Sequence, residues 1–230
     1  MASHTLAPTT PFAARDTRAL ASVWARLQPD SCPETYNFHM HTVCSDGKLH
    51  PHELMAQALE IGLRGLAITD HHTVQGYHAA QSWLEAQAPE GDRPHLWTGV
   101  EITSLLLDAE VHILGYGFDP DSAALTPYLQ GGAPQGEAAQ ARLVIQALKA
   151  AGGLVVLAHP ERYRLPASQL VPAAVTLGLD GVETYYAYRH VDPWEPTPAQ
   201  TAQVRDLSVQ YGLFRTCGTD THGTNLRLRL

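Results

Sequence analysis

The chain has 230 residues and a formal net charge of −8, from 15 basic and 23 acidic residues. Hydrophobic residues make up 44% and charged residues 17%, which excludes a disordered or coiled-coil protein. No apolar run approaches the roughly 18 residues of a membrane span, and the acidic balance argues against extended nucleic-acid binding. The three cysteines have no ligand spacing and the first residues no secretory pattern, so we expect a cytoplasmic protein with reduced thiols.

Residues 1–34 are predicted to form an N-terminal extension with one short helix, and residues 35–230 the main domain. In that domain short apolar strands alternate with helical segments. Such alternation predicts parallel strands with crossover helices, either in an open doubly wound sheet or in a barrel. The predicted strands are Tyr36–His41, Leu66–Asp70, Leu96–Glu101, Val111–Tyr116, Leu154–His159, Gly181–Thr184 and Thr216–Asp220. The predicted helices are Pro51–Ile61, Val74–Ala88, Glu137–Ala151, Ala167–Leu177 and Pro198–Tyr211.

The composition includes 13 histidines, nearly as many as the 15 lysines and arginines together. Histidine is the commonest metal ligand in proteins, and these residues are scattered from His4 to His222. Every predicted strand carries a histidine or an acidic residue, in most strands at the carboxyl end. Because the carboxyl ends of parallel strands meet on one face, we expect these side chains to converge there.

The spacing of His39 and His41 places both rings on one side of a strand, where two imidazoles can bind one metal ion. Imidazoles and carboxylates without thiolate suit Mn²⁺, Fe²⁺ or Zn²⁺. The candidate ligands are too many for one ion, so we expect two or three ions, with Glu101 as a bridging carboxylate. Sites with several metals are suited to phosphate ester hydrolysis.

Six segments resemble, in the same order, the motifs of the PHP (polymerase and histidinol phosphatase) superfamily. They cover about residues 36–223 and are Phe38–Thr42 with Ser45–Gly47, Ile68–His71, Gly99–Ile102, His112–Tyr116, Ala158–Pro160 and Gly218–Gly223. The resemblance implies an α/β fold, a distorted seven-stranded (β/α)7 TIM-like barrel. It also implies three divalent metal ions and phosphoesterase activity, in which a metal-activated hydroxide attacks the phosphorus.

The same resemblance assigns nine metal ligands in three overlapping groups. The first group would be His39, His41, Glu101 and Asp220; the second Asp46, His71 and His222; the third Glu101, His112 and His159. Glu101, as the bridging ligand, is also a predicted catalytic residue.

Further residues are predicted to contact the substrate or to support the ligands. Arg162 and Arg164 follow His159 and are candidates to bind phosphate through their guanidinium groups. His190 is a candidate both to bind substrate and to protonate the leaving oxygen. His72, where relatives usually carry Asp or Asn, is a third kind of candidate substrate contact. Candidates to support the ligands from behind are Asp70 and Glu183.

The expected substrates are small phosphate monoesters or short nucleotide and oligonucleotide ends. Only 58 positions separate Glu101 from His159, too few for a large substrate-capping insertion. Histidinol-phosphate phosphatase activity and a non-catalytic metal-binding interaction module remain as alternatives. An amidohydrolase with a carboxylated lysine is disfavoured, because neither Lys48 nor Lys149 ends a predicted strand.

Overall fold

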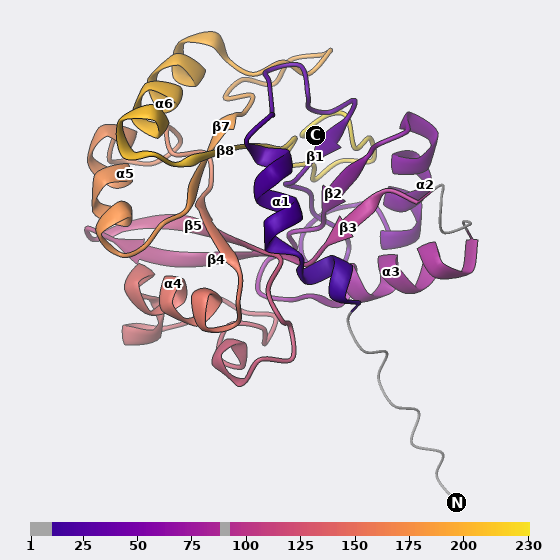
Figure 1. Cartoon of the computed structure of the whole chain (residues 1–230), viewed down its shortest axis with the longest axis horizontal. Helices are drawn as coiled ribbons and strands as arrows, with labels where there is room; N and C mark the ends of the chain where they lie inside the picture. The colour runs from indigo at the N-terminus through magenta and orange to yellow at the C-terminus, as the bar shows by residue number, and fades with distance from the viewer. Residues whose placement is uncertain (1–10, 88–92) are drawn as a thin grey trace, which may run out of the picture.

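The computed structural model describes residues 11–87 and 93–230 (Figure 1). Within these ranges the chain forms an α/β structure with two sheets. The helices are α1 (Thr17–Trp24), α2 (Pro51–Ile61), α3 (Gln75–Gln87), α4 (Ala141–Ala150), α5 (Ala167–Thr176) and α6 (Pro198–Tyr211), with short 3-10 segments η1 (Phe12–Arg15), η3 (Ala123–Leu125) and η4 (Gly136–Ala139). The strands are β1 (Tyr36–Asn37), β2 (Gly65–Ala67), β3 (His95–Trp97), β4 (Gly99–Leu106), β5 (Ala109–Tyr116), β6 (Leu154–Leu157), β7 (Gly181–Tyr185) and β8 (Phe214–Cys217).

The predicted seven-stranded barrel is wrong, because the strands form two separate sheets. One sheet has three parallel strands in the order β1-β2-β3, and the other has five mixed strands in the order β4-β5-β6-β7-β8. Helices α2 and α3 lie beside the first sheet, and α4, α5 and α6 lie around the second (Figure 1). We call the first sheet with its helices and the second sheet with its helices the two halves of the molecule. The strand-type pairings described between them are two single bridges, Met40 to Thr221 and His71 to Glu101.

The expected parallel arrangement also fails at β4 and β5, which form an antiparallel hairpin. Leu107 and Asp108 at its tip have φ angles of 50° and 57°, the conformation of a two-residue hairpin turn. Strand β4 therefore runs antiparallel to β5, and β5 antiparallel to β6. The predicted strand Leu96–Glu101 is also divided, since its first part pairs with β2 and its second with β5.

Helix boundaries follow the local sequence signals closely. Helices α2 and α6 begin at prolines, Pro51 and Pro198, and end before Gly62 and Gly212, whose φ angles are 81° and 64°. Proline suits the first turn of a helix, and glycine adopts the left-handed conformation that ends one. The predicted helix Glu137–Ala151 is instead interrupted at Gln140, which is extended and forms a bridge with Leu105.

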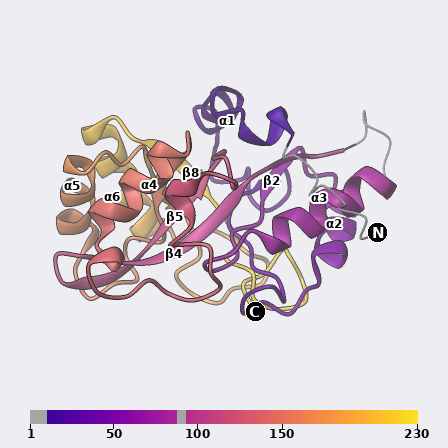
Figure 2. The ribbon, with the colours of Figure 1, turned by 90° about the horizontal axis from the view of Figure 1, so that it is seen from below.

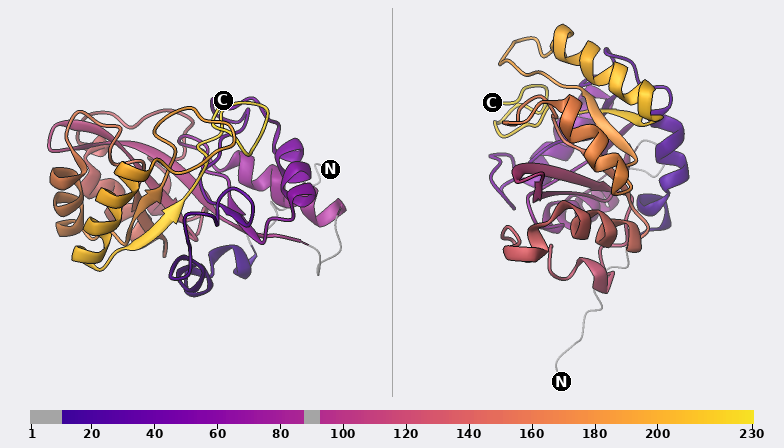
Figure 3. Two further views of the ribbon diagram at one scale, coloured as in Figure 1. Left: turned by 90° about the horizontal axis from the view of Figure 1, so that it is seen from above. Right: turned by 90° about the vertical axis from the view of Figure 1, so that its left-hand side faces the viewer.

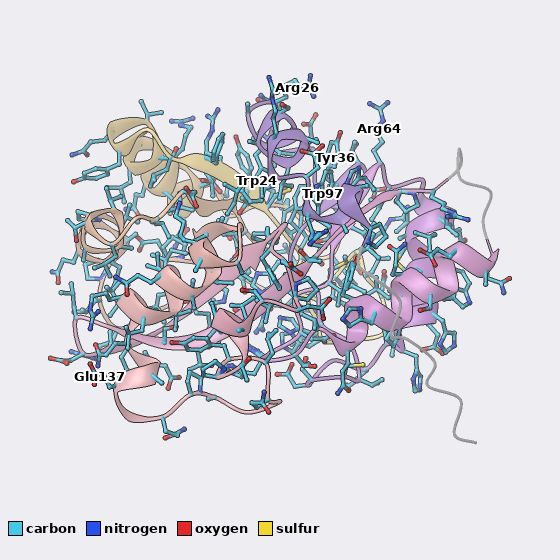
Figure 4. The ribbon with its side chains drawn as sticks, turned by 60° about the horizontal axis from the view of Figure 1, so that its bottom comes forward. Trp24, Arg26, Tyr36, Arg64, Trp97 and Glu137 are labelled. Atoms are coloured by element: carbon cyan, nitrogen blue, oxygen red, sulfur yellow. The ribbon has the colours of Figure 1, made fainter. Side chains whose placement is uncertain are left out.

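Helix α1 packs into the protein interior. Leu20 and Trp24 are fully buried, and the Trp24 ring lies 5.2 Å from Tyr116 and 6.0 Å from Phe38. In Figure 4, Trp24, Tyr36 and Trp97 lie together beneath this helix, whereas Arg26 and Arg64 point outward. Figure 2 places α1 on one side of the molecule and the C-terminus on the opposite side. The predicted boundary between an extension and a domain at residue 35 stays a prediction.

The segment 223–230 lies between the two halves of the molecule (Figure 3). Leu226 is fully buried, and its carbonyl accepts hydrogen bonds from Asn37 Nδ2 at 3.3 Å and from Thr219 and Thr221 hydroxyls at 3.0 Å. Among the helices of the described ranges, none combines the length and the apolar character that a bilayer crossing needs.

Candidate metal centre

Two short segments place the first ligands side by side. His39 and His41 follow β1, and Asp220 follows β8. The Asp220 amide donates to the His39 carbonyl at 2.8 Å, and the His41 amide donates to the Thr221 carbonyl at 3.0 Å. Gly218 permits this approach, since a Cβ there would lie 2.2 Å from His39 Cβ. The local sequence thus brings the His-x-His and Asp-x-His motifs against each other.

Glu101 lies at the centre of the cluster, at only 1% exposure. Its Oε2 atom is 3.0 Å from His39 Nε2, 3.0 Å from His41 Nε2 and 3.6 Å from His71 Nε2. Its Oε1 atom is 2.8 Å from His112 Nδ1 and 3.4 Å from His159 Nε2. Five predicted ligand rings therefore face this one carboxylate.

The remaining predicted ligands form a more exposed edge. The Asp46 side chain is 55% exposed, and its Oδ2 atom lies 3.3 Å from His222 Nε2 and 3.8 Å from His71 Nε2. The ring of His41 stacks between those of His222 and His71, with centroids 4.2 Å and 4.6 Å away. His41 thus connects the buried and the exposed parts of the cluster.

Glu183 supports the buried part from behind. Its Oε1 atom lies 2.9 Å from His39 Nδ1, and its Oε2 atom accepts the His159 backbone amide at 2.8 Å. It thereby fixes the ring that carries the Nε2 atom facing Glu101. Supporting carboxylates of this kind set the tautomer of a ligand histidine.

Asp70 has a different position from the one expected. It is buried and accepts hydrogen bonds from the Thr42 amide and hydroxyl at 2.6 and 2.7 Å and from the Ser45 hydroxyl at 2.8 Å. Among the described residues Asp70 makes no hydrogen bond to a ligand imidazole, and its predicted role in supporting the ligands stays a prediction. Asp70 instead anchors the loop that carries Asp46.

The electrostatics of the cluster favour a positive charge at its centre. Burial alone lowers the pKa of His39, but Glu101, Glu183 and Asp220 together raise it well above its ordinary value. At the edge, burial lowers the pKa of His71 to about 4, so this ring is neutral near pH 7 and its nitrogens can bind a cation.

Part of the cluster has ring nitrogens that no hydrogen bond satisfies. Among the histidines of the described residues, the buried ring nitrogens without a hydrogen-bond partner are His41 Nδ1 and Nε2, His71 Nδ1, His72 Nδ1 and His159 Nδ1. His41 Nε2 is close to two carboxylates, yet it is aligned for a hydrogen bond with neither. Buried polar atoms without a partner in the protein require an explanation, and an ion bound at the cluster is one.

The described residues contain three groups in which the possible ligand atoms all lie within 4.8 Å of one another. They are His39, His41, Glu101 and Asp220; His41, Asp46, His71 and His222; and His71, Glu101 and His112. The first group has the four residues expected from the sequence. The second contains His41 in addition to its expected members, and the third contains His71 in the place of His159. His159 stands outside these groups, although it contacts Glu101.

Backbone strain is concentrated at the same residues. His72, His159 and Asp220 have φ angles of 56°, 25° and 54°, which residues other than glycine rarely adopt. Strained backbone held in place by its surroundings is common at functional sites.

The structure leaves two predicted residues away from the cluster. His190 and Arg164 are exposed, and neither has a described contact with the ligand residues. The loop after β7 carries His190 outward, so its predicted role as a proton donor receives no geometric support.

His72 and Arg162 have defined contacts near the cluster. The buried His72 ring lies behind the cluster, with Nε2 3.2 Å from Thr103 Oγ1, and its role as a substrate contact stays a prediction. Arg162 donates from Nη1 to Asp220 Oδ2 at 3.0 Å and so lies next to a predicted ligand.

Sequence reasoning missed two residues that lie beside the centre. The Tyr163 hydroxyl accepts the His112 amide at 2.8 Å, and its ring lies 5.3 Å from His159. Arg229 donates to Asp220 at 2.9 Å. Its position three residues after Pro160 was a usable signal for Tyr163, whereas the position of Arg229 depends on the path of the segment 223–230.

Comparison with known proteins identifies the family. Residues 37–159, more than half of the chain, match the model of the PHP domain, and the chain therefore belongs to that family. Asp220 and His222 lie beyond the matched range.

Two relatives and one solved structure are similar to this chain, and their names describe enzymes that act on RNA or on phosphate esters. The chain is 37% identical over 118 residues to the 5′-3′ exoribonuclease Rnm of Salmonella typhimurium, covering 51% of this chain but only 38% of that protein. It is 24% identical to the phosphoribosyl 1,2-cyclic phosphate 1,2-diphosphodiesterase of Eggerthella lenta, covering 81% of this chain and 94% of that protein. A Bifidobacterium adolescentis structure assigned as a metal-dependent phosphoesterase is similar in fold, with a TM-score of 0.69, 24% identity and coverage of 86% and 90% of the two chains.

Proposed function

We propose that this protein is a metal-dependent phosphoesterase that hydrolyses phosphate monoesters or the phosphorylated ends of nucleotides and oligonucleotides. The observation that carries the proposal is the buried Glu101 carboxylate with five histidine rings around it. Membership of the PHP domain family supports it. Relatives that act on RNA ends and on a cyclic phosphate support phosphate esters as the substrate class.

The residues would hold up to three divalent ions. The buried ion would be bound by His39, His41, Glu101 and Asp220, and the exposed ion by His41, Asp46, His71 and His222. The third would be bound by His71, Glu101 and His112, with His159 beside them. Oxygen and imidazole donors without thiolate favour Mn²⁺, Fe²⁺ or Zn²⁺.

When bound, divalent ions supply Lewis acidity, which lowers the pKa of water and offsets charge on phosphate oxygens. The protein's own groups contribute position and charge. Glu183 holds the His39 ring, and Asp70 holds the loop that carries Asp46. The exposed Arg162 guanidinium beside Asp220 would attract an anionic substrate to this edge.

The position of the lysines disfavours an amidohydrolase with a carboxylated lysine. Lys48 is exposed, and Lys149 on α4 pairs with Asp180.

The test combines metal analysis with a substrate screen. Protein supplemented with Mn²⁺ would be analysed for metal per chain. It would then be assayed with p-nitrophenyl phosphate, histidinol phosphate, nucleoside monophosphates and 5′-phosphorylated oligonucleotides. We expect at least two ions per chain and turnover of nucleotide esters. Fewer than two ions would contradict the multi-metal centre. A clear preference for histidinol phosphate would favour the histidinol-phosphate phosphatase, and bound metal without any turnover the non-catalytic module.

A further inference from the structure

The segment 223–230 contains no helix or strand, so side chains of other elements determine its path. One of these side chains is Gln57 on helix α2. Its Nε2 group donates to the Thr224 carbonyl at 2.9 Å, and its Oε1 atom accepts the Leu226 amide at 2.9 Å. A glutamine amide offers a donor and an acceptor together, so Gln57 binds two backbone groups of the segment as a neighbouring strand would.

Leu226 connects this contact with the candidate metal centre. Its amide is bound by Gln57, and its carbonyl accepts the Thr219 and Thr221 hydroxyls, each at 3.0 Å. The two threonines stand directly before and after Asp220, and both are fully buried together with Leu226. A predicted ligand is therefore linked through one buried residue to a helix that carries no predicted ligand.

Asp220 needs support of this kind because its backbone is strained. Its φ angle is 54°, a conformation that residues other than glycine keep only where the surroundings hold them. Asn37 holds the same place from the other side: its Nδ2 group donates to the Thr219 hydroxyl at 2.8 Å and to the Leu226 carbonyl at 3.3 Å, and its Oδ1 atom accepts the Thr219 amide at 3.1 Å. The Leu226 carbonyl is thus a shared acceptor for the two chain segments that carry His39 and Asp220.

The other contacts of the segment differ in kind from those of Gln57. The Leu226 side chain belongs to the same buried apolar cluster as Leu54 of α2, a contact that sets its depth but not the direction of its backbone. Arg227 points outward and pairs with Glu34 at an exposed place, where an ion pair contributes little. Among the described hydrogen bonds of α2, only those of Gln57 fix the backbone on both sides of residue 225.

We propose that Gln57 is a positioning residue of the metal centre, which acts through the segment 223–230 on the predicted ligands Asp220 and His222. The inference rests on the metal binding in the proposed function and not on the ester that is hydrolysed. Docking of the segment by Gln57 raises the affinity of the ligands for metal. Because coupling between two sites is reciprocal, bound metal raises the stability of the docked segment by the same factor.

The first experiment measures Mn²⁺ affinity by competition with a chelator. The variant Gln57→Met keeps the length and helix propensity of the side chain and removes both hydrogen bonds. We expect roughly tenfold weaker binding, the effect of losing one or two hydrogen bonds. Gln81→Met is the matched control, because the Gln81 amide pairs with Glu85 on its own helix α3 at 2.6 Å, and Arg227→Gln is the control for the exposed contact of the segment. Equal affinity of Gln57→Met and the wild type would overturn the inference.

The second experiment separates positioning from a general loss of stability. Amide hydrogen exchange, followed by mass spectrometry on peptides that cover residues 219–230, would be measured with and without Mn²⁺. We expect metal to slow exchange at Leu226 in the wild type, and Gln57→Met to speed it in the metal-free protein while the hairpin β4–β5 stays unchanged. An equal increase in the hairpin of the metal-free variant would show a merely structural role and overturn the inference, as would a wild-type segment that does not respond to metal.

The two measurements also distinguish this inference from the proposed function. Neither involves a substrate, so normal metal binding without turnover would contradict the phosphoesterase alone. Turnover and metal affinity at the wild-type level in Gln57→Met would contradict the positioning role alone.

Discussion

The buried and exposed sides of the candidate metal centre use the same kinds of residue but support them differently. On the buried side, His39, His41 and Glu101 are at most 1% exposed, and Glu183 fixes the His39 ring. On the exposed side, the Asp46 side chain is 55% exposed and contacts its histidines only at 3.3 to 3.8 Å. Rigid, desolvated ligands favour retention of an ion, whereas an exposed edge can exchange ions and admit a substrate. We therefore expect the two sides to respond unequally to substitution.

The largest effect is expected for Glu101→Gln. The substitution removes the negative charge that five histidine rings face, so we expect lower metal content and more than about a hundredfold loss of phosphatase activity, above the range for groups that only support ligands. Metal analysis and kinetics would measure both. Glu110→Gln, at an exposed position on the same hairpin, is the control. Wild-type turnover in Glu101→Gln would exclude Glu101 as a bridging ligand.

A smaller effect on the buried side is expected for Glu183→Gln. If the amide oxygen keeps the His159 bond, its NH₂ group faces His39 Nδ1 and forces the ring proton onto Nε2. That tautomer cannot bind metal through Nε2, so we expect roughly 10- to 100-fold weaker metal binding. Competition titration with a metal chelator would measure it, with Glu34→Gln as an exposed control. Unchanged affinity would show that Glu183 does not set the tautomer.

On the exposed side, Asp46→Asn should remove one ion and leave the others. Asp46 belongs only to the group with His41, His71 and His222, so the buried group stays complete. We expect the metal content to fall by about one ion per chain. The free energy of unfolding should fall less than in Glu101→Gln. Asp108→Asn, in the exposed hairpin turn, is a suitable control because asparagine tolerates a positive φ angle. Loss of all metal would contradict the separation into two sides.

The smallest effect is expected for Arg227→Gln. The pair of Arg227 with Glu34 is exposed, so its loss should change the free energy of unfolding by less than about 1 kcal/mol. Metal content should not change. Urea denaturation and metal analysis would check this, and a large loss of metal would indicate that the segment 223–230 depends on this outer contact.

Helix boundaries and chain order could be predicted from the sequence because their signals are local. Pro51 with Gly62, and Pro198 with Gly212, determine helix ends within a few residues. The hairpin could not be predicted, because the conformation of Leu107 and Asp108 depends on pairing between β4 and β5 and not on a typical turn sequence. The strands also divide between β3 and β4, so that two sheets stand in place of the predicted barrel.

The same difference between local signals and long-range contacts explains which residues of the site could be predicted. The histidines and the acid that follow β1, β2, β6 and β8 come together because parallel strands carry their carboxyl ends to one place. Glu101 and His112 instead lie within the antiparallel strands β4 and β5. Arg229 depends on a chain reversal at Gly223, for which the sequence gives no rule of position. His190 lies on an irregular loop, where residue type alone says little about direction.

The packing of α1 determines where the chain can be cut or fused. The family match begins at residue 37, after Leu20, Trp24 and Leu27, which are all buried. A protein started at residue 37 would leave the aromatic surface around Phe38 in water and is expected to aggregate. Phe38 directly precedes the predicted ligand His39, so such a truncation is also expected to loosen the candidate metal centre. An affinity tag or fusion partner therefore belongs ahead of α1.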